Sequence, residues 1–77
     1  MLEVINNALA KKDYYICLYD NYLYLYNYLE IISFNNDLII VKLSNNRVKI
    51  KGSSLFIKKM HQHELLIEGN IVSVSYE

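Results

Sequence analysis

The sequence contains no proline and no tryptophan, and its 77 residues include two glycines and one cysteine. A single cysteine excludes an internal disulfide bond. Two isolated glycines exclude a glycine-rich phosphate-binding loop. The chain also has no run of 18 apolar residues, so no transmembrane helix is expected. We therefore expect a cytoplasmic protein whose thiol is reduced.

The chain also carries no net charge, because eight basic residues balance eight acidic ones. Such a chain has no overall field that would attract nucleic acid. A single core in a domain this small supplies only a few kcal/mol of net stability. Since neither disulfides nor a metal cluster are expected, we predict that the protein gains stability by associating with a partner.

No group of residues indicates catalysis or metal binding. Cys17 lies within an apolar segment, which predicts a buried and inert thiol. His61 and His63 flank Gln62 in a predicted turn and supply two ligands, whereas structural zinc needs four and catalytic zinc three. The expectation is a protein that is not an enzyme and has no cofactor, no metal and no small-molecule substrate.

Hydrophobic periodicity divides the chain into residues 1–12 and residues 13–77. The first segment places Leu2, Ile5 and Leu9 on one face of a short amphipathic helix. The second alternates with period two and is interrupted by asparagine-rich turns, which predicts strands joined by tight loops. We expect an all-β domain of about six to eight short strands, an antiparallel meander curled into a roll, barrel or sandwich. A β-solenoid is the rival fold, but the sequence has no repeat. The predicted strands are Tyr14–Tyr19, Tyr22–Tyr26, Tyr28–Phe34, Leu38–Leu43, Arg47–Gly52, Leu55–Met60, Glu64–Glu68 and Ile71–Tyr76.

Tyrosine is unusually abundant and provides eight of the ten aromatic residues. Tyr22, Tyr24, Tyr26 and Tyr28 are expected on one face of a long strand, with leucines on the other. One interpretation is a central strand that is packed on both sides, with hydroxyls at the rim. A second is an exposed aromatic face that binds a partner. Stacking on single-stranded nucleic acid is disfavoured, because residues 13–37 contain no lysine or arginine.

A basic segment follows, comprising Arg47, Lys49, Lys51, Lys58 and Lys59. The first three should share one strand face, opposite Val48 and Ile50. They form either a solvated face that guards a sheet edge or a docking patch for an acidic protein surface or anionic lipid headgroups.

The β region resembles the YabP/YqfC family of sporulation proteins, and more closely its YqfC branch. The resemblance rests on the strand and turn pattern of Leu29–Phe34, Leu38–Ser44, Val48–Gly52, Leu55–Met60 and Glu64–Ile71. It implies expression in the mother cell of an endospore-forming Firmicute and a role in forming the spore envelope. It also implies a peripheral position beside a membrane protein such as YabQ or YqfD, at the outer membrane of the forespore.

Together these observations predict a structural or assembly protein that acts by protein–protein association. The expected partners are further copies of the chain, a membrane protein, or both, and Leu38–Leu43 and Ile71–Tyr76 are the candidate association strands. The alternative is a small β-barrel that binds single-stranded nucleic acid through tyrosine and lysine side chains.

Overall fold

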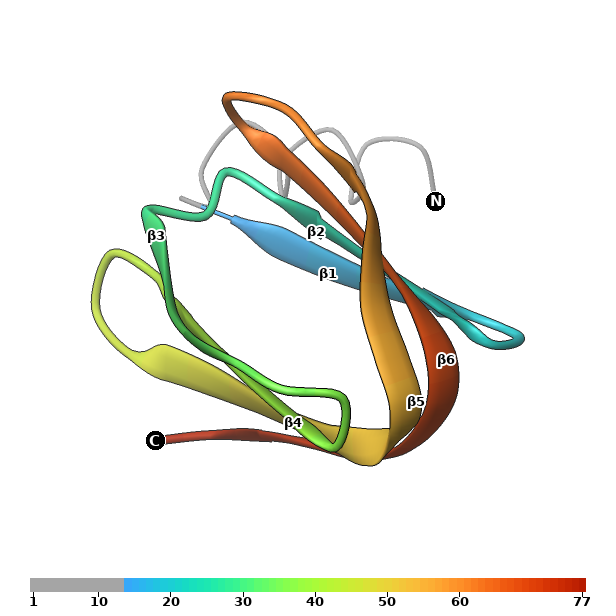
Figure 1. Cartoon of the computed structure of the whole chain (residues 1–77). Helices are drawn as coiled ribbons and strands as arrows, with labels where there is room; N and C mark the ends of the chain where they lie inside the picture. The colour runs from blue at the N-terminus through green and yellow to red at the C-terminus, as the bar shows by residue number, and fades with distance from the viewer. Residues whose placement is uncertain (1–13) are drawn as a thin grey trace, which may run out of the picture.

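A computed structural model describes residues 14–77, and the regular structure in this part of the chain is all β. The predicted helix over residues 1–12 lies outside the described residues. The strands form a single antiparallel sheet with the order β1-β2-β6-β5-β4-β3 (Figure 1). Their bounds are Tyr15–Tyr19 for β1, Tyr22–Tyr26 for β2, Glu30–Phe34 for β3, Leu38–Lys42 for β4, Arg47–Met60 for β5 and Glu64–Tyr76 for β6.

A long, bent hairpin of β5 and β6 organises the sheet. The prediction placed strand ends at Gly52 and at Gly69, whereas both strands continue through these positions. Three irregularities in the β5–β6 register fall between Lys51 and Lys59, and they bend the hairpin instead of ending it. The four short strands predicted here are therefore two long ones.

Both glycines lie where the two strands of this hairpin approach closely. A Cβ atom at Gly52 would lie 2.0 Å from the backbone oxygen of Asn70. Gly69 has a φ of 147°, and a Cβ there would lie 2.7 Å from the backbone oxygen of Ser54. Glycine is needed at both positions because any side chain would push the paired backbones apart at the bend.

The bend divides the sheet into two halves that fold over each other (Figure 1). In one half β1 pairs with β2, and β2 pairs with residues 64–68 of β6. In the other half β3 pairs with β4, and β4 pairs with residues 47–51 of β5. The predicted meander is wrong at one connection, since β2 neighbours β6 and not β3. Asn27, with a φ of 64°, turns the chain away from β2. The amide of Leu29 then donates a hydrogen bond to the oxygen of Lys42 at 2.9 Å, in the other half.

The apolar side chains between the two halves form the core. Leu23 and Leu25 of β2 are fully buried, as are Val48 and Ile50 of β5. The period-two alternation read from the sequence is therefore confirmed for these strands. The complete set of buried residues is Leu23, Leu25, Ile39, Val41, Leu43, Val48, Ile50, Leu55, Leu65 and Ile67.

Candidate interaction surfaces

Tyrosine side chains cover the outward side of β1 and β2. Since Leu23 and Leu25 point into the core, their neighbours Tyr22, Tyr24 and Tyr26 point away from it. The β1–β2 register places three β1 residues beside them on the same side. This outcome favours the outward aromatic face over the strand packed on both sides. We call this surface the tyrosine face, and it consists of Tyr15, Cys17, Tyr19, Tyr22, Tyr24 and Tyr26.

Tyr28 was predicted to belong to this row, and that prediction is wrong. The left-handed backbone of Asn27 ends β2 and reverses the alternation. The Tyr28 ring packs against the core, and its hydroxyl donates a hydrogen bond to the backbone oxygen of His61 at 3.1 Å. Leu29, which was expected to lie with the buried leucines, is 57% exposed.

The rings of the tyrosine face contact one another and the neighbouring strands. The Tyr15 ring lies 5.8 Å from that of Tyr24 and 5.3 Å from that of Tyr26, in tilted arrangements. The Tyr24 hydroxyl donates a hydrogen bond to the carboxylate of Glu64. This bond is the main cause of the raised pKa of Tyr24, and burial and the charge of Glu64 add to it. The contacts orient the inner rings, while Tyr19 remains 74% exposed.

Two of the predicted basic residues lie beside the tyrosine face. The ammonium of Lys58 lies 5.1 Å from the centre of the Tyr22 ring and 3.3 Å from its hydroxyl. The same ammonium pairs with Glu68 at 3.3 Å, and the hydrogen bonds to Tyr22 and Glu68 raise the pKa of Lys58. Lys59 and Lys58 line a hollow of about 390 Å³ together with residues of the tyrosine face. Proximity of these lysines to tyrosines depends on the strand order and was not expected from the sequence.

The other three predicted basic residues lie on the outward side of the second half. Arg47, Lys49 and Lys51 share that side because Val48 and Ile50 are buried between them. Lys42, opposite Arg47 on β4, extends the set and was missed in the sequence because it ends an apolar run. We call these four residues the basic face. The expected single patch of five basic residues is therefore two separate groups, because the bend at Gly52 lies between Lys51 and Lys58.

Glu77 partly neutralises the basic face. Its carboxylate lies 3.2 Å from the guanidinium of Arg47 and 3.0 Å from the ammonium of Lys49. The hydrogen bond to Lys49, with the charges of both cations, holds the pKa of Glu77 below its usual value. Backbone hydrogen bonds between Glu77 and Arg47 keep these side chains adjacent.

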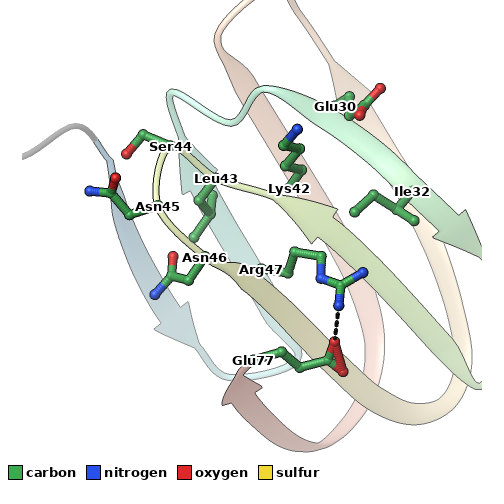
Figure 2. A pocket seen from close by; sticks show the side chains of 9 residues that line it. All are labelled: Glu30, Ile32, Lys42, Leu43, Ser44, Asn45, Asn46, Arg47 and Glu77. Carbon is green, nitrogen blue, oxygen red and sulfur yellow. Dashed lines mark ion pairs between the residues drawn. The ribbon is translucent and has the colours of Figure 1, made fainter.

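A surface hollow of about 550 Å³ opens beside this ion pair, between β3, β4 and the loop that follows β4. Figure 2 shows its lining, with Arg47 paired to Glu77, and with Glu30 and Lys42 on adjacent strands. Its lining contains two carboxylates and two cations, so the hollow carries no large net charge. The residues that line it are Glu30, Ile32, Lys42, Leu43, Ser44, Asn45, Asn46, Arg47 and Glu77.

The placement of Cys17 differs from its prediction, whereas the two histidines lie in the expected turn. Cys17 was predicted to be buried, but it is exposed in the middle of the edge strand β1, on the tyrosine face. The prediction failed because the outward side of an edge strand is apolar here without being covered. His61 and His63 lie exposed at the turn between β5 and β6. Within residues 14–77, no three metal-ligating side chains come together.

One of the two predicted association strands is unsuitable. Leu38–Leu43 corresponds to β4, which is paired on both sides, with β3 and β5. The other predicted association strand, residues 71–76 of β6, pairs with β5 on one side only, because β2 pairs with residues 64–68 of β6. The ends of the sheet are β1 and β3.

A comparison with known protein families identifies the chain, because the model of the YabP family matches residues 11–77. The chain belongs to the YabP family. No curated protein and no solved structure matches it. The expected family is thus confirmed, while the YqfC branch stays a prediction. No helix within residues 14–77 is long and apolar enough to cross a membrane.

In this YabP-family protein, the pattern that carried the resemblance describes the core and the bend. Two parts of this pattern consist of an isoleucine, one further residue and a glycine. Their isoleucines, Ile50 and Ile67, are fully buried. The glycines that follow are Gly52 and Gly69, where the paired strands approach closely. The pattern therefore fixes the fold and specifies no chemical group at either outward face.

Proposed function

We propose that this protein is a non-enzymatic structural protein of endospore formation that acts by protein–protein association at the spore envelope. Membership of the YabP family suggests a role in sporulation. The observation that supports association is the tyrosine face, an outward sheet surface built from aromatic rings. Tyrosine is enriched at the centres of protein interfaces because it combines a large apolar ring with a polar hydroxyl.

The charges around the tyrosine face favour a protein as its partner. Lys58 and Lys59 lie along one side, and Glu64 and Glu68 lie opposite Tyr26 and Tyr22 in the β2–β6 register. Two cations and two anions leave the face without net charge. A patch of aromatic rings with a balanced polar rim matches the usual anatomy of a protein–protein interface.

The use of the charged groups supports a role without catalysis. Glu64 accepts the hydrogen bond of Tyr24, Glu68 pairs with Lys58, and Glu77 holds the basic face. In each case a carboxylate is engaged in a contact that fixes the shape of a surface. None of these contacts resembles a nucleophile activated by a general base.

The partner that we propose is a membrane protein, reached from the cytoplasmic side in the mother cell. The basic face lies in the other half of the sheet from the tyrosine face, so both can be engaged at once. Basic side chains near a bilayer are attracted by anionic headgroups, by about 1 kcal/mol for each residue. The basic face would thus hold the protein at the membrane surface, while the tyrosine face contacts the membrane protein.

The experiment places a photocrosslinking amino acid at Tyr19 of the tyrosine face, in sporulating cells. Tyr19 is 74% exposed, so the replacement should leave the fold intact. The matched control carries the same amino acid at Ile32, which is 43% exposed on the opposite edge strand. We expect a membrane protein of the YabQ or YqfD type to be crosslinked from position 19 and not from position 32. Normal spores in a deletion strain, or equal crosslinking from both positions, would contradict the proposal.

Binding of single-stranded nucleic acid is the second candidate, and the position of Lys58 over Tyr22 is the observation that favours it. Stacking proteins combine aromatic side chains with cations that follow the backbone. Glu64 and Glu68 on the same side oppose a polyanion, which places this candidate second. A salt-dependent titration with single-stranded oligonucleotides decides between the two. Micromolar affinity that is lost in both Tyr24→Ala and Lys59→Ala would favour nucleic acid.

A further inference from the structure

The two end strands of the sheet differ in how they are protected. β3 begins with Glu30 and contains an irregularity between Ile31 and Ser33, and both features discourage pairing with another strand. β1 contains no charged residue, no proline and no bulge. Among the residues that the structure describes, its outer edge is open, and it is the better template for a further strand.

Two backbone hydrogen bonds between the ends of β2 and β6 show which backbone groups of β1 face this open edge. The oxygen of Asn21 accepts from the amide of Gly69 at 3.0 Å, and the amide of Asn27 donates to the oxygen of His63. Odd-numbered residues of β2 therefore bond to β6, and the even-numbered ones bond to β1. Tyr22, Tyr24 and Tyr26 are opposite odd-numbered residues of β1, so the amides and carbonyls of Ile16 and Leu18 point outward.

The sequence of β1 is symmetric about its centre. Tyrosine occupies both ends, Ile16 and Leu18 flank the middle, and Cys17 stands at the centre. An antiparallel pair of such strands places each residue opposite one of the same kind. A twofold interface requires this self-complementarity.

We propose that two copies of the chain pair antiparallel through β1, with Cys17 opposite Cys17 of the second copy. In this register Ile16 of each copy forms a hydrogen-bonded pair with Leu18 of the other, which uses all the outward backbone groups of both residues. Shifting the register by two residues leaves one of these pairs outside the strand. The inference rests on the proposed function in that it names a second copy as one of the associating partners.

Pairing in this register covers the side chains that β1 leaves in water. Leu18 is 57% exposed on the inner side of the sheet, and it would lie beside Ile16 of the second copy. On the outer side, the exposed Tyr19 would lie beside Tyr15 of the second copy, so the two tyrosine faces become continuous. Each copy contributes a strand of five residues, far fewer than the roughly 20–30 residues of a standard interface. We therefore expect a reversible dimer with micromolar affinity.

The native cysteine tests the register directly. Directly opposite residues of a non-hydrogen-bonded pair have Cα atoms about 4.5 Å apart, within the range that a disulfide spans. The full chain at about 50 µM is treated with diamide, which takes up the two electrons and two protons that the two thiols release. The control Cys17→Ser/Tyr19→Cys moves the thiol to a more exposed position, where the two copies' cysteines would lie on the order of 14 Å apart. We expect disulfide-linked dimer at least tenfold faster from Cys17 than from the control.

Sedimentation at increasing concentration tests the pairing without the thiol. Leu18→Lys places a charge on the β1 edge, whereas Ile32→Lys places one at an exposed position of β3. The dimer should be lost in the first variant and kept in the second. A monomer at all concentrations up to 100 µM would overturn the pairing and leave photocrosslinking from Tyr19 unaffected. A dimer that survives Leu18→Lys, with equal oxidation rates for both thiol positions, would overturn it as well.

Discussion

Replacing Gly52 by alanine tests the bend on which the arrangement of the two halves depends. The added Cβ would lie 2.0 Å from the backbone oxygen of Asn70 and 3.0 Å from its carbonyl carbon. Comfortable separations of such atoms are roughly 3.5 Å. Because the obstacle is backbone and not a flexible side chain, β5 and β6 must move apart by more than about 1 Å at this point.

The cost follows from what that separation disturbs. Overpacking of this kind typically costs about 1–3 kcal/mol. The amide of Gly52 also donates to the oxygen of Asp37 at 3.1 Å, and the amide of Leu55 donates to Asn36 at 2.8 Å. Weakening one such hydrogen bond adds about 0.5–1.5 kcal/mol. We therefore expect Gly52→Ala to lower the free energy of unfolding by about 2–4 kcal/mol, a large part of the ~4–12 kcal/mol typical of a chain this long.

Urea unfolding followed by circular dichroism measures this effect. The matched control is Lys51→Ala, because Lys51 is the exposed neighbour of Gly52 on the same strand. Its free energy of unfolding should stay within about 0.5 kcal/mol of the wild-type value. A midpoint for Gly52→Ala that equals the control, with an unchanged slope, would mean that the strands do not approach closely at the bend. The division into two facing halves would then be incorrect.

Three further predictions concern single side chains. Leu65→Ala removes a fully buried side chain and should cost about 2–5 kcal/mol in the same unfolding assay; a cost under 1 kcal/mol would contradict its place in the core. The raised pKa of Tyr24 means that its bond to Glu64 stabilises the fold below the usual pKa of 10.0 and is lost as the pH rises through the raised pKa. The ring carbons of Tyr24, followed by NMR against pH, should titrate above 10.0 and move back toward 10.0 in Glu64→Gln. The lowered pKa of Glu77 means that its ion pairs contribute above the ordinary value of 4.5 and are lost as the pH falls through the lowered pKa. Its carboxyl carbon should titrate below 4.5, and Lys49→Met should raise that midpoint.

The strands could be predicted from the sequence because side-chain alternation is a local property. Leu23 and Leu25 alternate with tyrosines, and Val48 and Ile50 with cations, and in both strands the aliphatic residues are buried. Gly52 was misread as the end of a strand. Glycine favours a turn and a bent strand equally in local sequence, and only the presence of a continuing partner strand distinguishes the two.

The candidate surfaces were harder to predict because they depend on strand order. Lys58 is far from Tyr22 in sequence. The two side chains meet because β6 pairs with both β5 and β2. Cys17 has apolar neighbours in sequence, and it is exposed because β1 is an end strand. Neither relation has a signal in the spacing of residues along the chain.

The bend also gives the protein two outward faces, and their chemistry differs. Folding the sheet over itself gives each half one inner side, and the core fills it with aliphatic residues. Each outer side must then remain compatible with water. The second half achieves this with charged side chains, and the first does so with tyrosines, whose hydroxyls reach solvent while the rings remain available for contact. Pairing through β1 would use only the first half and leave the basic faces of both copies uncovered. A dimer would thus present two basic faces to one anionic surface, and two weak attachments held together bind far more tightly than one.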